Sequence, residues 1–129
     1  MLGLLFLFSK FAQMFTSKEI QRYDRHIQLD EILVSELQDW MKSDKKFNLI
    51  DIREEYERED YKLNDTHFIP MGEMMNSLEK ISEKIPTVIY CQTGNKSKAI
   101  FYMLKKQNFI NCYSLMGGVN AWVNKEINK

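Results

Sequence analysis

The sequence predicts an α/β protein in which a central parallel sheet is flanked by helices on both faces. Short apolar runs alternate with segments whose apolar residues recur at helical spacing, from about Ile32 to the end of the chain. Strands that alternate with helices in this way form parallel sheets covered on both sides. The chain has 129 residues and is 44% hydrophobic, which allows one domain of ordinary size plus a short extension. We therefore expect a domain over residues 31–129 and an N-terminal extension over residues 1–30.

Five short strands are expected in this domain, each marked by an apolar or β-branched run. They cover Ile32–Val34, Phe47–Ile52, His67–Pro70, Thr87–Tyr90 and Cys112–Leu115. The run at Thr87–Tyr90 is the kind that a strand buried on both faces shows. We expect it to be the central strand.

Helical segments fill the spaces between these strands. They are a helix capped by Ser35 that carries Leu37, Trp40 and Met41, a short charged turn at Glu54–Glu59, helices over Glu73–Glu83 and Lys96–Gln107, and a last helix that follows Gly117-Gly118. In the fourth of these segments Ala99, Ile100, Met103 and Leu104 recur at one- and four-residue spacings, which is typical of one buried helix face. No repeat, low-complexity tract or long linker interrupts the domain.

The first part of the N-terminal extension is apolar but does not have the form of a membrane anchor. Met1 to Phe15 is interrupted by Ser9, Lys10 and Gln13, and it is shorter than the roughly 20 residues that span a bilayer. A secretory signal would show a basic start and a small-residue cleavage site, and neither is evident. We expect a helix packed on the domain, or a misplaced translation start, and no membrane association.

Charge and cysteine content exclude several classes of protein. Eighteen basic and eighteen acidic residues cancel, so nothing indicates a nucleic-acid partner. Cys91 and Cys112 are too few for a disulfide framework and lack metal-ligand spacing, so we expect no metal and no cofactor. A cytoplasmic location suits a working thiol, because the cytosol keeps thiols reduced. Cys112 has no chemical motif around it and is expected in the core.

The loop Cys91-Gln92-Thr93-Gly94-Asn95-Lys96-Ser97 is the strongest candidate for a site. It connects the central strand to a helix, and ligands bind at the carboxyl ends of strands in open α/β sheets. Backbone N–H groups of such a loop, with those of the first helical turn, converge on an anion. A cysteine at the mouth of this cradle favours the thiolate form, which is the nucleophile.

Four motifs in a fixed order give the domain a resemblance to a known family. They are LIDIRE at Leu49–Glu54, HFIP at His67–Pro70, CQTGNKS at Cys91–Ser97 and LMGGVNAW at Leu115–Trp122. From about Ile32 to Ile127 the chain resembles the rhodanese-like sulfurtransferases. It looks most like those fused to ubiquitin-activating-enzyme-like adenylyltransferases, and the segment RYDRHI resembles the opening of such an enzyme. The glycine-rich nucleotide-binding turn of that enzyme is absent from this sequence.

The resemblance implies that Cys91 takes a sulfur from a small anionic donor such as thiosulfate and holds it as a persulfide. The acceptor would be a nucleophile: cyanide in the test tube, and a thiol or a sulfur-carrier protein in the cell. Loop N–H groups from Gln92 to Ser97 would stabilise both the thiolate and the persulfide. Gly94 would give the loop its backbone freedom, Lys96 would offer a positive charge to the donor, and the hydroxyls of Thr93 and Ser97 would add hydrogen bonds, with Asn95 completing the loop.

Asp51 and Arg53 follow the neighbouring strand and are expected to hold the loop by an ion pair, with substrate contact as the second interpretation. Two other functions stay open. A phosphatase or arsenate reductase of the same fold needs five residues between its cysteine and its arginine, whereas four separate Cys91 from Lys96. A non-catalytic binding module is the second alternative, and the intact loop argues against it.

Overall fold

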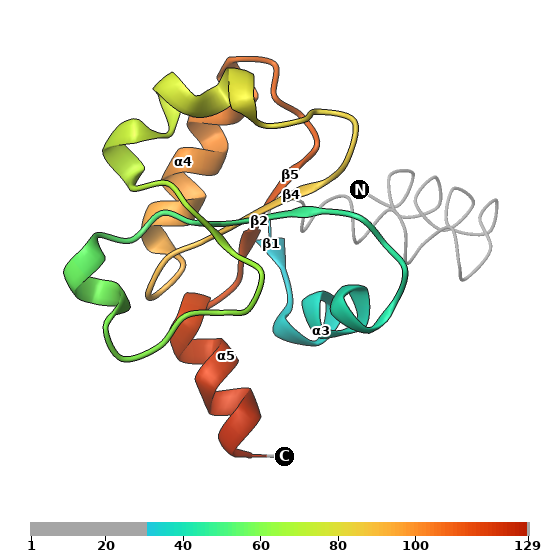
Figure 1. Cartoon of the computed structure of the whole chain (residues 1–129), viewed down its shortest axis with the longest axis vertical. Helices are drawn as coiled ribbons and strands as arrows, with labels where there is room; N and C mark the ends of the chain where they lie inside the picture. Colours follow the sequence, from blue (N-terminus) through green and yellow to red (C-terminus); the bar gives the residue numbers. More distant parts are fainter. Residues whose placement is uncertain (1–30, 129) are drawn as a thin grey trace, which may run out of the picture.

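A computed structural model describes residues 31–128, and its backbone forms a five-stranded, fully parallel sheet (Figure 1). The strands are β1 (Glu31–Ile32), β2 (Asn48–Asp51), β3 (His67–Phe68), β4 (Thr87–Tyr90) and β5 (Cys112–Leu115). Their order across the sheet is β1-β5-β4-β2-β3, and every neighbouring pair runs parallel. The predicted fold class and the central place of Thr87–Tyr90 are confirmed. The extension predicted over residues 1–30 lies outside the described residues.

In residues 31–128, three α-helices and three 3₁₀ turns accompany the strands, and the last helix follows β5. The helices are α3 (Val34–Lys42), α4 (Asn95–Lys106) and α5 (Gly118–Ile127), and the turns are η1 (Glu55–Arg58), η2 (Met71–Glu73) and η3 (Met75–Lys80). In the part of the chain that the structure describes, no helix has both the length and the apolar content needed to cross a membrane.

The sheet separates two hydrophobic cores, one on each face. On one face α4 and the η2–η3 segment cover Ile50, Ile89 and their neighbours, and on the other α3 and α5 cover Leu49, Val88 and theirs. Figure 1 shows α4 on the opposite side of the sheet from α3 and α5. Because side chains alternate along a strand, β4 sends Val88 to one core and Ile89 to the other. The same alternation places the side chain of Cys91 in the core that α4 covers.

The helix predicted over Glu73–Glu83 is wrong in type. The structure has two 3₁₀ turns there, with i→i+3 bonds such as Ser77 N–H to the carbonyl of Met74 at 3.0 Å and Ile81 N–H to that of Leu78 at 3.1 Å. The apolar residues still serve the core, since Met74 is fully buried. Their spacing fits the tighter turns as well as it fits an α-helix.

Two smaller expectations also need correction. The first helix begins at Val34, so the first strand is shorter than predicted and Ser35 lies inside the helix. In α4 the buried face contains Ile100, Phe101 and Leu104. Ala99 and Met103 are exposed, because the helix turns the other flank of Ile100 toward the sheet.

Candidate functional site

Cys91 lies directly after β4, at the carboxyl end of the sheet, with its sulfur enclosed by the loop that follows. Its side chain is buried, and two backbone N–H groups point at Sγ: that of Gly94 at 3.1 Å and that of Ser97 at 3.3 Å. These donors sit in the loop and in the first turn of α4, where N–H groups have no partner inside the helix. The cradle therefore offers preformed hydrogen bonds to a negative charge on sulfur.

Gly94 allows this geometry because it adopts a left-handed conformation, with φ at 95°. A residue with a side chain is strained in this region of backbone space. The turn reverses the chain so that α4 begins at Asn95 with its N-terminus beside Cys91. The partial positive charge of that N-terminus adds to the two hydrogen bonds.

A buried pair of hydroxyl groups extends the site behind the sulfur. Ser97 Oγ lies 3.4 Å from the sulfur of Cys91, 3.1 Å from the carbonyl oxygen of Gly94 and 2.6 Å from Ser114 Oγ on β5. Both serines are at most 1% exposed. A hydroxyl has one proton and can accept as well as donate. In this arrangement the Cys91 thiol donates to Ser97 Oγ, and Ser97 donates its one proton to the carbonyl oxygen of Gly94. Ser97 can donate to a thiolate by turning that proton from Gly94 to the sulfur while Ser114 donates to Ser97 Oγ.

The start of α5 holds the loop from the other side. Val119 N–H donates to the carbonyl of Cys91 at 3.0 Å, and Asn120 N–H donates to the carbonyl of Gln92 at 3.1 Å. This close approach requires glycine, since a Cβ on Gly118 would lie 2.3 Å from the carbonyl oxygen of Cys91. The segment predicted as a turn before the last helix is thus part of the site.

Arg53 is a buried cation that joins three neighbouring segments. Its guanidinium forms an ion pair with Asp51 at 2.9 Å and donates to the carbonyl oxygens of Glu57 and Tyr61. It also donates to the side-chain oxygen of Gln92 at 3.0 Å. All of its donor groups have protein partners. Arg53 therefore braces the loop and the η1 segment and has no free N–H for a ligand.

The carboxyl group of Asp51 is the counter-charge of this brace. It accepts from Arg53 and from Arg58 Nε at 2.9 Å. Burial raises the pKa of Asp51, but the hydrogen bonds and charge of Arg53, with the bond from Arg58, more than offset burial and hold that pKa below its usual value. Asp51 is therefore a fixed negative charge at the centre of the brace.

The remaining loop residues face outward. Thr93 and Asn95 are exposed, and the Gln92 side chain spans from Arg53 to Asn120, donating to Asn120 Oδ1 at 2.6 Å. The Lys96 side chain is 57% exposed, and its ammonium lies 3.9 Å from Glu57 Oε1. The positive charge of Lys96 therefore lies at the surface and is partly offset by Glu57.

A groove with a volume of about 740 Å³ opens beside the loop, between α5 and the chain from η1 to Tyr61. Gln92 and Asn120 lie at its wall next to the loop. Among residues 31–128, no group of three or more acidic, histidine or cysteine side chains is placed to hold a metal.

The structure brings Cys91, its loop, Asp51 and Arg53 together at one edge of the sheet. Ser114, Asn120 and Arg58 also contribute to the site and were not predicted from the sequence. Ser114 sits in an ordinary strand, and only the pairing of β5 with β4 carries it to Ser97. Arg58 lay in a segment read as a solvated charged turn, where nothing pointed to Asp51.

The fold and this loop define a class: parallel α/β domains that present a cysteine in a loop whose backbone N–H groups point at the sulfur. The family model of the rhodanese-like domain matches residues 33–125. The chain belongs to the rhodanese-like family.

Individual relatives agree with this family. The chain is 34% identical over 90 residues to a probable adenylyltransferase/sulfurtransferase, MoeZ, of Mycobacterium tuberculosis. This match covers 67% of this chain and 23% of MoeZ. It is 28% identical over 90 residues to the thiosulfate sulfurtransferase GlpE of Coxiella burnetii, covering 69% of this chain and 84% of that one. A crystal structure of a rhodanese-like domain protein from Staphylococcus aureus superposes with a TM-score of 0.67 at 23% identity, over 73% of this chain and 91% of that chain. The chain thus spans about a quarter of MoeZ and most of GlpE.

Proposed function

We propose that this protein is a sulfurtransferase that carries a sulfane sulfur as a persulfide on Cys91. The observation that supports this most directly is the pair of backbone N–H groups, from Gly94 and Ser97, that point at Sγ. Such donors stabilise a thiolate before the reaction and the negative charge on the persulfide after it. The names of MoeZ and GlpE point to the same chemistry in relatives.

The reaction consists of two displacements at sulfur. In the first, the Cys91 thiolate attacks the outer sulfur of a donor such as thiosulfate, the new S–S bond forms, and sulfite leaves with the electrons of the broken bond. In the second, an acceptor such as cyanide attacks the terminal sulfur, thiocyanate leaves, and the thiolate is restored. Splitting the transfer in this way is covalent catalysis.

Each residue of the site has a role in this scheme. The backbone N–H groups of Gln92, Thr93 and Asn95 would donate hydrogen bonds to the oxygens of the donor. Lys96 adds a positive charge there. The pair of Asp51 and Arg53 holds the loop in place through Gln92, so it acts by positioning.

In the cell, we propose that the acceptor is a thiol or a sulfur-carrier protein and that the setting is the cytoplasm. Both cysteines of the described chain are free thiols. A thiol that must cycle between thiolate and persulfide works in a compartment that keeps it reduced.

Sulfur transfer from thiosulfate to cyanide tests the proposal. Wild-type protein should form thiocyanate, Cys91→Ala should form none above background, and Cys112→Ala should keep most of the activity. Cys112 is the matched control because it is also a buried cysteine, with its thiol directed at the carbonyl of Phe109 at 3.3 Å. Full activity in Cys91→Ala would show that the nucleophile is assigned wrongly.

A further inference from the structure

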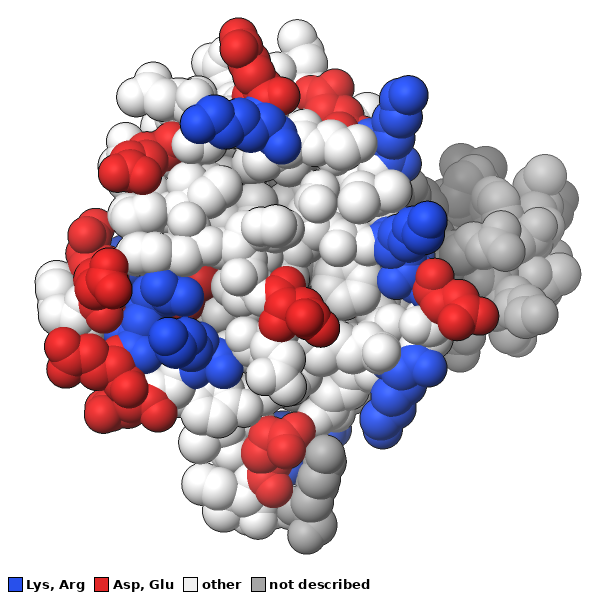
Figure 2. Space-filling model, in the orientation of Figure 1, with Lys and Arg blue, Asp and Glu red and all other residues white. Residues whose placement is uncertain are grey.

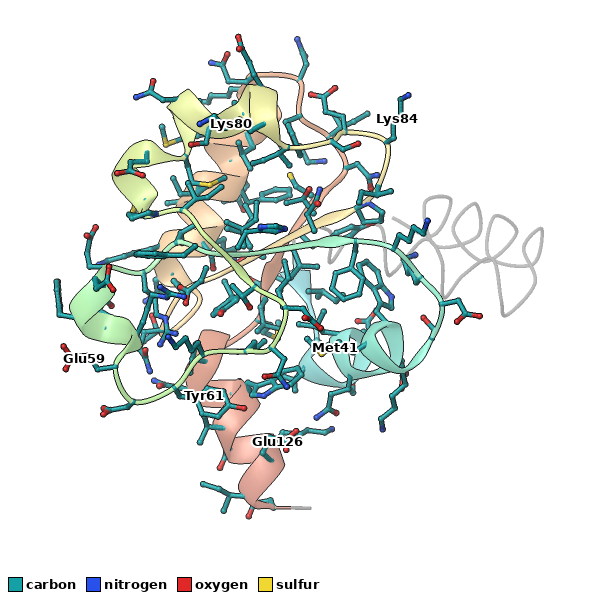
Figure 3. All side chains as sticks on the ribbon, viewed as in Figure 1. Met41, Glu59, Tyr61, Lys80, Lys84 and Glu126 are labelled. Atoms are coloured by element: carbon teal, nitrogen blue, oxygen red, sulfur yellow. The ribbon has the colours of Figure 1, made fainter. Side chains whose placement is uncertain are left out.

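The groove beside the loop has two walls that are tied to each other. The α5 wall presents Val119, Val123 and Ile127, which lie four residues apart and so share one side of the helix. Tyr56 and Tyr61 line the opposite wall. The walls are connected where Trp122 Nε1 donates to the Tyr61 hydroxyl at 3.0 Å, and Figure 3 shows Tyr61 beside α5. A direct hydrogen bond therefore joins the two walls of the groove.

One end of the groove reaches the nucleophile's own loop. Gln92 directly follows Cys91, and its side chain and that of Asn120 meet at 2.6 Å along the groove wall. Their backbones are joined as well, by the bond from Asn120 N–H to the carbonyl of Gln92. A ligand that lies along α5 would thus end one residue from the sulfur.

Large apolar side chains along this groove are exposed to solvent. Tyr56 is 72% exposed, Ile127 is 74% exposed and Tyr61 is 39% exposed. Single exposed apolar residues are ordinary, but a group of them that lines one concavity marks a surface that another molecule covers. Tyrosine is also enriched at protein–protein interfaces.

The charge of the groove is negative. Its lining includes the carboxylates of Glu57 and Asp60, and Glu55 and Glu59 flank them in sequence. Figure 2 shows acidic side chains over the segment that is green in Figure 1, with basic side chains among them. The one cation in the lining, Arg53, is 1% exposed, and Asp51, Gln92 and two backbone carbonyls occupy its donors. An anionic ligand would find no unpaired cation in this lining, whereas a cation would find the carboxylate of Asp60 and that of Glu57, which Lys96 approaches at 3.9 Å.

We propose that this groove binds an extended, basic segment of a partner protein, the one that exchanges sulfur with Cys91. The segment would place aliphatic side chains against Val123 and Ile127 and lysine or arginine side chains beside Glu57 and Asp60. This inference rests on the proposed function, because sulfur transfer is what would bring a partner protein to the Cys91 loop. The binding itself depends only on the groove.

Capped fluorescent peptides test the docking directly. One peptide contains lysine and leucine separated by serine, and the other has glutamate in place of each lysine. The wild-type protein should bind the lysine peptide and discriminate against the glutamate peptide. Asp60→Lys should weaken binding of the lysine peptide by about threefold to tenfold, as expected for reversing one exposed charge pair.

Glu79→Lys is the matched control, because Glu79 is an exposed carboxylate on η3, on the other face of the sheet. It makes the same change in net charge and should leave binding of both peptides unchanged. Asp60→Lys should also improve binding of the glutamate peptide, a gain that a misfolded variant would not show. Equal effects of the two substitutions, no binding to wild type, or equal binding of both peptides would overturn the proposal.

Transfer from thiosulfate to cyanide is measured on the same wild-type preparation. Peptide binding without any transfer would refute the proposed function and leave the docking site standing. Transfer without selective peptide binding would refute the docking site alone.

Discussion

Replacing Gly118 by alanine should disrupt the contact between α5 and the cysteine loop. The new Cβ would lie 2.3 Å from the carbonyl oxygen of Cys91 and 2.7 Å from the carbonyl carbon of Gln92, and both atoms belong to backbone that cannot swing away. Gly118 also has a φ of 58°, and this left-handed conformation costs a residue with a side chain about 1–2 kcal/mol.

The displaced helix would also lose hydrogen bonds to the loop. The bonds from Val119 N–H to Cys91 and from Asn120 N–H to Gln92 are each worth roughly 0.5–1.5 kcal/mol. With the conformational cost, the expected loss in the free energy of unfolding is about 2–5 kcal/mol, a large part of the stability of an ordinary domain. Protein that still folds should lose sulfur transfer, because the carbonyl next to the nucleophile must move.

Urea denaturation measures this loss, and Gly72→Ala serves as the control. A Cβ at Gly72 would meet no atom within 4 Å, so that variant should stay within about 0.5 kcal/mol of wild type. If the two variants had equal stability, the close approach of α5 to the loop would be refuted.

Three further predictions concern the polar groups of the site. Ser114→Ala should slow alkylation of Cys91 at neutral pH, because Ser97 then loses the partner that orients its hydroxyl; Ser97→Ala should slow it further, and an unchanged rate in both variants would contradict this role. The pKa of Asp51 is lower in the folded protein than in the unfolded protein, so ionised Asp51 stabilises the fold. This stabilisation is present above the unfolded-state pKa and is lost as the pH falls through the folded-state pKa. When the free energy of unfolding is measured against pH, wild type should lose this stabilisation below about pH 4, and Asp51→Asn should show no such loss. Lys96→Ala should weaken thiosulfate use by less than about tenfold in steady-state kinetics, because this lysine is 57% exposed and its charge is screened; a loss well beyond that would show a tighter contact with the donor.

The central strands and the loop could be predicted because their signals are local. Both β4 and β5 have the predicted bounds, Thr87–Tyr90 and Cys112–Leu115, since each is a short run bounded by turn or loop residues. The position of Cys91 follows from β4 alone, because a residue that ends a central parallel strand lies at the ligand-binding edge of the sheet.

The rest of the site depends on contacts between distant segments. Ser114 meets Ser97 only because β5 pairs with β4, and Asn120 reaches Gln92 only because α5 packs against the loop. The predicted type of helix at Glu73–Glu83 was wrong for a related reason. The apolar pattern shows which residues are buried, but it does not distinguish the i→i+4 hydrogen bonds of an α-helix from the i→i+3 bonds of a 3₁₀ turn. Strand order and helix docking carry no short-range signal in a single sequence.

The persulfide on Cys91 is the central claim, and mass spectrometry of the protein after treatment with thiosulfate tests it most directly. We expect one additional sulfur atom on the peptide that contains Cys91, none on the peptide that contains Cys112, and loss of that sulfur when cyanide is added. An unmodified Cys91 peptide after treatment with thiosulfate and with other sulfane-sulfur donors would contradict the account and leave a binding module in its place.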